Sequence, residues 1–328
     1  MSTAQRVPET FELTGDDARE TLLWSGHRSL LRDAFLRLRY ADGFSHARSL
    51  AFVLNLVLVQ ATIALVGLAS ALGAGGGRSN IVKVLHDTVP GPAGNLLSDA
   101  VDQARRAGAS QQYLGLTLGL VGALVTASTA MGQIERGLNR LYGVEQDRPT
   151  VQKYAHAALL AVTAGVLAVV AFVALAFGSG IHQLTGSAFA AHAWAVLRWP
   201  LAIAASLASV ALLFEKAPRR RQPAWSWLAF GAGIAVALWI VATAMLGLFF
   251  SLTGSFGRTY GPLAGVVALQ IWAFLSSVAL FYGGAMAAQL EAVRAGNAEP
   301  QDEEKVEESE PDREAPPLVG ALDGATRS

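Results

Sequence analysis

The chain has 328 residues, of which 52% are hydrophobic and only 15% are charged, and its formal net charge is zero. Ordinary soluble domains carry roughly 25% charged residues, so this composition excludes that class. The chain contains no cysteine, which excludes disulfides, iron–sulfur clusters and thiolate zinc sites.

Long apolar stretches recur along the chain. A transmembrane helix rises about 1.5 Å per residue and needs roughly 20 apolar residues to cross a bilayer core about 30 Å thick. Six stretches have this character, at residues 50–72, 114–131, 154–177, 194–214, 225–250 and 263–290. We therefore predict an all-α polytopic membrane protein with six transmembrane helices. Its membrane domain is expected at residues 28–294, between a polar N-terminal segment at 1–27 and a tail at 295–328.

The segment just before the first span, residues 28–47, has the pattern of a basic amphipathic helix. Leu30, Ala34, Phe35 and Leu38 recur at helical spacing, and charged side chains fill many of the other positions. In one interpretation this helix lies in the headgroup layer, where anionic lipid would contact four arginines: Arg28, Arg32, Arg37 and Arg39. In the other interpretation the helix packs against the protein's own cytoplasmic face.

The loop between the first two spans, residues 73–113, contains a second short helical pattern. Asn95 is expected to cap a helix whose apolar stripe consists of Leu96, Leu97, Ala100, Val101 and Ala104. This helix is too short and too charged to span a membrane. We predict that it rests on the bundle or on the membrane surface outside the cytoplasm.

Small and polar residues occur inside the spans. Gly115 and Gly119 form a G-x-x-x-G pair, a spacing that allows close helix packing. The candidate polar interior positions are Asn55, Gln60, Gln270 and Ser277. On the last span Gln270, Ser277, Gly284 and Glu291 recur every seven residues, so we expect this stripe to face the bundle interior. An amide left unpaired in hydrocarbon costs about 4–8 kcal/mol. These groups therefore either hydrogen-bond between helices or line a polar cavity for a substrate.

Positive charge is distributed unevenly among the loops. Counted outside the spans, 19 Lys and Arg residues fall on one side of the predicted topology and 5 on the other. The positive-inside rule then places both termini in the cytoplasm.

The tail is strongly acidic. Residues 299–314 include nine acidic side chains and several prolines, a composition typical of disorder. An acidic tail of this kind either recruits a basic protein partner or is simply a solvated extension.

The sequence carries no recognisable catalytic motif. It has no glycine-rich phosphate loop, no nucleophile elbow, and six scattered histidines without metal-ligand spacing. We therefore expect no catalytic residue, no cofactor, no bound metal and no nucleic-acid partner, and we do not expect an enzyme.

Three segments resemble the YihY/BrkB family of bacterial inner-membrane proteins: residues 45–52, residues 134–154 and residues 260–285. The motif positions that carry the resemblance are Glu135, Asn139, Tyr142, Tyr260, Gly261 and Trp272. The resemblance covers about residues 28–294 and implies a six-span helical protein of the cytoplasmic membrane. The chain departs from the family pattern at two places, because residues 53–71 lack a proline and Met286 stands where many members have a glutamate.

Three functions are considered for such a protein. The first is a non-enzymatic membrane protein that transports or translocates an envelope lipid or a small solute. The second is a scaffold whose basic helix and acidic tail hold partners, and this hypothesis predicts a solidly packed bundle without a cavity. The third follows from the label "ribonuclease BN" carried by family members. It is the least favoured, because zinc-dependent nuclease chemistry needs clustered His and Asp ligands, and the sequence has no such cluster.

Overall fold

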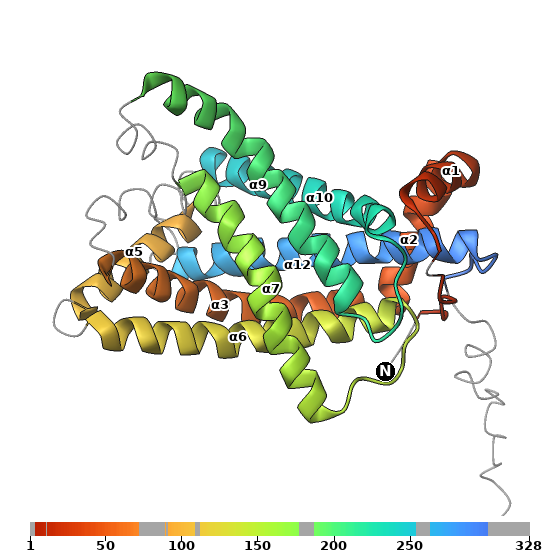
Figure 1. Ribbon diagram of the computed structural model, residues 1–328, viewed down its shortest axis with the longest axis horizontal. Helices are drawn as coiled ribbons and strands as arrows, with labels where there is room; N and C mark the ends of the chain where they lie inside the picture. The colour runs from red at the N-terminus through yellow and green to blue at the C-terminus, as the bar shows by residue number, and fades with distance from the viewer. Residues whose placement is uncertain are drawn as a thin grey trace, which may run out of the picture.

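The computed structural model describes residues 4–10, 12–71, 89, 91–108, 112–176, 187–253 and 263–300. Over these residues every regular element is an α-helix, which confirms the predicted all-α fold. The helices are α1 (Gly15–Ser25), α2 (His27–Tyr40), α3 (Gly43–Ala71), α5 (Pro92–Gly108), α6 (Gln112–Leu141), α7 (Thr150–Ala176), α9 (Ala188–Lys216), α10 (Trp225–Leu252) and α12 (Leu263–Arg294). Helices α3, α6, α10 and α12 run along the long axis, and α7 and α9 cross them obliquely (Figure 1).

Five described helices are long and apolar enough to cross a membrane. The qualifying segments are residues 43–64, 150–171, 192–216, 225–252 and 263–294. The remaining predicted span, residues 114–131, lies inside α6, which continues to Leu141 and carries three charged residues in its last two turns: Glu135, Arg136 and Arg140. Thirty residues of helix extend about 45 Å, enough to cross a bilayer. The sixth span therefore stays a prediction.

Small residues bring the long helices close together. At the crossing of α10 and α12, a Cβ added to Gly283 would lie 2.6 Å from the carbonyl oxygen of Gly231. At the contact of α3 with α6, a Cβ on Gly119 would lie 2.9 Å from the backbone nitrogen of Ala64. Gly115 is one turn earlier in α6. Backbones that approach this closely gain van der Waals contact that larger side chains would prevent.

The start of the chain differs from the prediction. The expected amphipathic helix at 28–47 is interrupted after Tyr40, because Asp42 adopts a left-handed conformation with φ 54°. Residues 43–47 belong instead to α3, whose first residue, Gly43, packs directly on Leu38. The polar segment 1–27 also contains an unpredicted helix, α1, whose N-terminal turn is closed by hydrogen bonds from Thr14 to the Asp17 carboxylate.

The helix in the loop after the first span is present as α5. It begins at Pro92, so Asn95 lies in its first turn and not at the cap. Of its predicted apolar stripe, Leu97 is fully covered and Val101 is 1% exposed, whereas Leu96 and Ala100 are half-buried. The stripe packs on α12 and α3.

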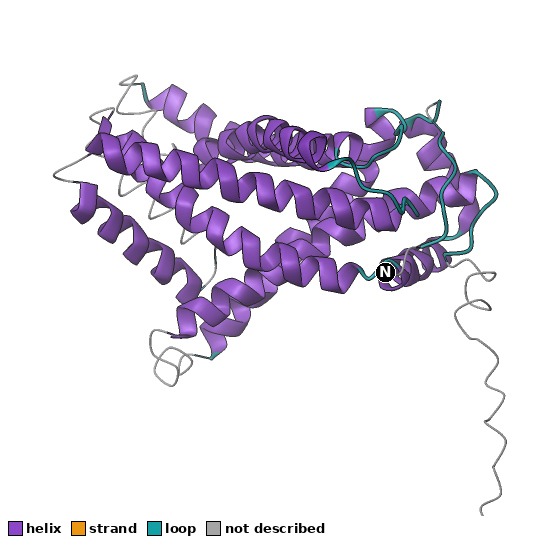
Figure 2. Cartoon of the chain, turned by 90° about the horizontal axis from the view of Figure 1, so that it is seen from below, coloured by secondary structure: helices purple, strands orange, loops and turns teal. Residues whose placement is uncertain are grey.

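At the opposite end of the bundle, several loops and the N-terminal residues come together (Figure 2). We call this end the N-terminal face. It consists of residues 4–10, α1, α2, the 142–149 loop, the 217–224 loop and residues 295–300. The first six residues of the predicted tail thus lie in this face, and residues 301–328 are outside the described part of the chain.

Candidate functional site

A buried ion pair joins the end of α12 to the loop between α9 and α10. The two guanidinium Nη atoms of Arg220 donate to the two carboxylate oxygens of Glu291 at 3.0 and 2.7 Å. The Arg220 side chain is 2% exposed and that of Glu291 is fully buried. The backbone nitrogen and hydroxyl of Thr10 also donate to Glu291. Such bidentate pairs fix both distance and orientation.

Arg37 of α2 is also fully buried, which corrects the prediction that it contacts lipid. Its Nε donates to the side chain of Gln289 at 2.7 Å, and its Nη1 donates to the carbonyl oxygens of Gln5 and Leu141. Burial lowers the pKa of Arg37 to about 10, which still leaves the group charged at neutral pH. The other three arginines of this set, Arg28, Arg32 and Arg39, are exposed.

Tyr142 packs against one of these two buried arginines. Its ring lies 4.6 Å from the guanidinium carbon of Arg220, a cation–π contact. Burial raises the pKa of the Tyr142 hydroxyl, so the side chain is neutral. Tyr142, a family-motif position, therefore acts here as a packing partner for a buried cation.

Two other motif residues hold the loops of the N-terminal face. Glu135 is fully buried and pairs with Arg148 at 2.9 Å. The side-chain oxygen of Asn139 accepts from the backbone nitrogen of Arg219 at 2.8 Å, and its amide donates to Asp147. These contacts tie the C-terminal end of α6 to both the 142–149 and the 217–224 loops.

Asp147 is the acidic centre of the 142–149 loop. Lys153 donates to its carboxylate at 3.0 Å, and Arg136 lies 3.7 Å away. Partial burial alone would raise the pKa of Asp147, but the hydrogen bonds from Lys153 and Asn139 outweigh it and hold the pKa below its usual value.

The predicted polar positions inside the spans pair within the bundle. The Asn55 amide donates to the side-chain oxygen of Gln270, joining α3 to α12. Ser277 is buried and donates to the carbonyl oxygen of Ala273 at 2.8 Å. The side chain of Gln60 packs against Gly122 of α6. Hydrogen bonds thus join Asn55 to Gln270 and hold Ser277, whereas the side-chain oxygen of Asn55 is buried without a partner among the described residues.

The stripe on α12 does face inward. Ser277, Gly284 and Glu291 are buried, and Gln270 is half-buried. Gly284 admits the Leu138 side chain of α6, because a Cβ at this position would lie 2.6 Å from Leu138 Cδ2. Trp272, which belongs to the family-motif segment at residues 260–285, donates through Nε1 to the Thr243 hydroxyl at 3.1 Å. Tyr260 and Gly261 lie outside the described residues.

A partly open cavity of about 390 Å³ lies between the helices, and two of its wall residues, Leu54 and Ser276, adjoin Asn55 and Ser277 in the chain. Each of the five candidate membrane helices contributes to its wall, at positions away from the helix ends. Its lining is Leu54 of α3, Ala168 and Ala171 of α7, Ser206, Ser209 and Val210 of α9, Ala235, Val236 and Trp239 of α10, and Ser276 and Leu280 of α12. Pattern analysis missed this site, because its walls are alanines, serines and aliphatic residues that look like ordinary packing positions.

The described residues offer no candidate metal site, since no group of three or more His, Asp or Glu side chains comes together in them. The functional candidates are therefore the bundle cavity and the charged N-terminal face.

A model of the family described as "Virulence factor BrkB" matches residues 34–308. The chain belongs to the BrkB family. The match covers α3 to α12 and the second half of α2, so the BrkB family pattern includes both the cavity helices and the loops held by Glu135 and Asn139. The resemblance predicted from sequence motifs is confirmed.

Curated bacterial relatives agree with membership of the BrkB family. The chain is 26% identical over 270 residues to "Putative ribonuclease-like protein YfkH" of Bacillus subtilis, which covers 80% of this chain and 95% of that protein. It is 29% identical over 255 residues to a UPF0761 membrane protein of Aromatoleum aromaticum, covering 74% of this chain and 59% of that protein. A UPF0761 membrane protein of Pseudomonas aeruginosa is 28% identical over 178 residues, or 54% of this chain and 43% of that protein. No solved structure matches the chain.

Proposed function

We propose that this BrkB-family membrane protein carries a lipid or a small apolar solute of the bacterial envelope across the cytoplasmic membrane, and that the bundle cavity is the binding site. The observation that supports this proposal is the convergence of all five candidate membrane helices on one cavity. A site at the junction of several helices can change shape when any of them moves.

The chemistry of the cavity favours an apolar ligand. Most of its lining is aliphatic or aromatic. The hydroxyl of Ser209 donates to the carbonyl oxygen of Ala164 and that of Ser276 to the carbonyl oxygen of Trp272, so these two donors are already satisfied within the protein. Ala168 is exposed at the bundle surface, where a membrane lipid has access. An acyl chain fits this surface better than a charged solute does.

The cavity also distinguishes the transport hypothesis from the scaffold hypothesis. A scaffold requires only a stable bundle, and it predicts no internal space. The open volume of about 390 Å³ at the junction of five helices favours the carrier. In the proposed orientation the N-terminal face is in the cytoplasm, as the excess of positive charge at that end predicts.

A pair of adjacent serines gives a sharp test of occupancy. Because the chain has no cysteine, Ser276→Cys and Ser277→Cys each create a single thiol. Only Ser276 lines the cavity, whereas Ser277 is 1% exposed and faces the packed interior. The probe is phosphatidylglycerol that carries a diazirine on its acyl chain. After illumination, mass spectrometry should find cross-links in the peptides that line the cavity around Ser276. Thiol modification of Ser276→Cys should abolish those cross-links, and Ser277→Cys should resist modification.

Lipid transport between the two leaflets is tested by filling the cavity with a larger side chain. Ser206→Phe places a ring in the cavity, and Ala204→Phe places the same ring on an exposed position of the same helix. Proteoliposomes containing a fluorescent phosphatidylglycerol should show protein-dependent exchange between leaflets that Ser206→Phe reduces and Ala204→Phe does not. Equal exchange with both variants, or an absence of cavity cross-links, would refute the carrier.

A further inference from the structure

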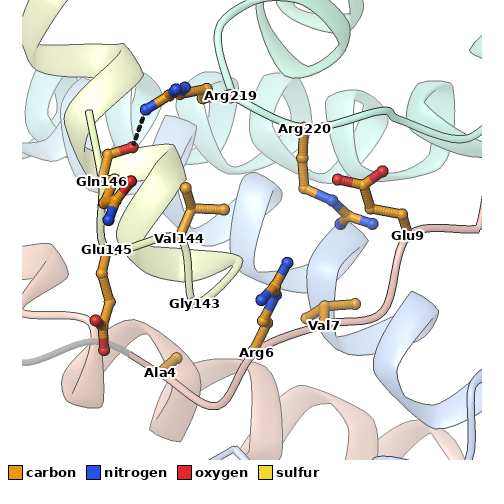
Figure 3. A pocket seen from close by; sticks show the side chains of 10 residues that line it. All are labelled: Ala4, Arg6, Val7, Glu9, Gly143, Val144, Glu145, Gln146, Arg219 and Arg220. Atoms are coloured by element: carbon orange, nitrogen blue, oxygen red, sulfur yellow. Dashed lines mark hydrogen bonds between the residues drawn. The ribbon is translucent and has the colours of Figure 1, made fainter. Parts of the chain in front are cut away.

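A second pocket, of about 570 Å³, lies on the N-terminal face and is independent of the proposed transport site (Figure 3). Its walls come from residues 4–9, from the 143–146 part of the loop after α6, and from Arg219 and Arg220. Segments distant in sequence therefore build one concave surface outside the membrane-spanning parts of the helices.

Three arginines line this pocket. Figure 3 shows Arg6 near its centre, with Arg219 and Arg220 on either side. Two acidic residues, Glu9 and Glu145, are also in the wall. Glu145 extends away from Arg6, and Glu9 lies on the side of Arg220 (Figure 3). The centre of the pocket is therefore positively charged.

Two of the three guanidinium groups are held in place before any ligand binds. Arg219 donates through Nη1 to the carbonyl oxygen of Asp147 at 2.9 Å. Arg220 is fixed by Glu291 and by the carbonyl oxygen of Pro8, while its buried Nε has no hydrogen-bond partner within the described part of the chain. The side chain of Arg6 has no ion-pair partner among the described residues. The guanidinium of Arg6 thus keeps unused donors between two arginines that the protein fixes.

We infer that this pocket binds the phosphate group of a polar organic molecule. Guanidinium groups bind phosphate through paired N–H donors, and Arg6 together with a neighbouring arginine can supply them. The volume falls in the range of sites for whole organic ligands and exceeds what a bare phosphate needs. The Glu9 carboxylate can accept a hydrogen bond from a hydroxyl or amino group on the same ligand.

The pocket is also coupled to the fold of the N-terminal segment. Val7 donates its backbone N–H to the carbonyl oxygen of Tyr142, and Ala4 donates to that of Arg140. These bonds position the extended segment that carries Arg6. A bound phosphate would therefore add a bridge between residues 4–10 and the 217–224 loop.

The test is isothermal titration calorimetry on the full chain in phosphatidylcholine nanodiscs at low salt, with glycerol 3-phosphate as the probe and glycerol as the uncharged control. We expect binding of glycerol 3-phosphate only. Arg6→Gln should weaken it by about tenfold or more, because one charge-assisted contact is lost. Arg39→Gln, which removes an exposed arginine of α2 outside the pocket wall, should not change it.

A second variant and a second membrane complete the design. Glu9→Gln keeps a side-chain oxygen that can accept the ligand's hydrogen bond but removes a negative charge that repels phosphate, so it should tighten binding. This variant tests the site even if Arg6→Gln perturbs folding. Nanodiscs containing phosphatidylglycerol distinguish the source of the phosphate. If phosphatidylglycerol competes with glycerol 3-phosphate, the ligand is a lipid headgroup. If it does not compete, the ligand is a soluble molecule. Equal heats for glycerol 3-phosphate and glycerol, or unchanged affinity in both variants, would overturn the inference. Neither result depends on lipid movement through the bundle cavity.

Discussion

At Glu291 a carboxylate without solvent contact is balanced by one guanidinium group and by Thr10. Removing one member of a buried pair leaves the other charged and desolvated, which is far more costly than the net gain from forming the pair. The family-motif residue Tyr142 lies against the same arginine, so the pair and its aromatic neighbour form one unit.

We predict that Glu291→Gln destabilises the protein by about 3–5 kcal/mol, because Arg220 loses its counter-charge. The measurement is thermal unfolding of the purified chain in detergent, followed by circular dichroism. Glu20→Gln is the matched control, since Glu20 pairs with Arg294 on an exposed surface where screening is strong. Its melting temperature should equal that of the parent. A Glu291→Gln protein that melts with the parent would show that Glu291 is not needed to balance Arg220.

The pKa of Asp147 predicts an acid-sensitive loop. Its folded-state pKa is lowered, so the ionised carboxylate stabilises the fold fully above its usual unfolded value near 3.8. That contribution disappears as the pH falls from about 3.8 through the lower folded-state pKa. Asp147→Asn should therefore melt earlier than the parent at pH 7, and the difference should shrink toward pH 3. If the difference in melting temperature between Asp147→Asn and the parent is constant over this pH range, the stabilising role of the ionised Asp147 carboxylate is contradicted.

At the scale of elements, glycine positions decide how closely helices pack. The carbonyl oxygen of Gly231 and the Cβ of Ala235 both lie 2.6 Å from where Gly283 would place a Cβ. A side chain at Gly283 forces α10 and α12 apart. Gly233 lies on α10, two residues after Gly231, and a Cβ added to it would have no atom within 4 Å.

We predict opposite effects for the same substitution at these glycines. Gly283→Ala should cost about 1–3 kcal/mol of stability through overpacking. Gly233→Ala should be neutral or stabilising by up to about 1 kcal/mol, because alanine has the higher helix propensity. Melting temperatures in one detergent, with size-exclusion profiles as a check on aggregation, compare the two. Similar melting temperatures for both would show that the α10–α12 crossing tolerates separation.

At the scale of the whole molecule, the topology is open to direct test. Glu12→Cys lies between residues 4–10 and α1 of the N-terminal face, Asn95→Cys lies on α5 at the other end, and both positions are exposed. A membrane-impermeant maleimide should label Asn95→Cys in intact cells and Glu12→Cys only in inverted vesicles, as the charge distribution predicts. The reverse pattern would invert the orientation, and labelling of both from one side would change the number of spans.

The sequence predicted the long helices because hydropathy and length are local properties. It also predicted that the α12 stripe faces inward, since a repeat of seven places Ser277, Gly284 and Glu291 on one side. The sequence-based prediction failed where residues distant in the chain determine the surroundings of a side chain. Arg37 looks like a lipid-facing arginine until Gln289 and the carbonyl oxygens of two other segments surround it. The alanines, serines and aliphatic residues of the cavity wall form no distinctive sequence pattern, so only the packing of five helices reveals the cavity.

The hydrogen bonds of residues 4–10 impose an order on biogenesis. Gln5 pairs with Asn297, 292 positions later, and Thr10 pairs with Glu291. During translation these early residues leave the ribosome long before their partners at positions 291 and 297 have been synthesised. A segment synthesised ahead of the whole bundle is therefore among the last to reach its native place, and its docking marks the completion of the N-terminal face.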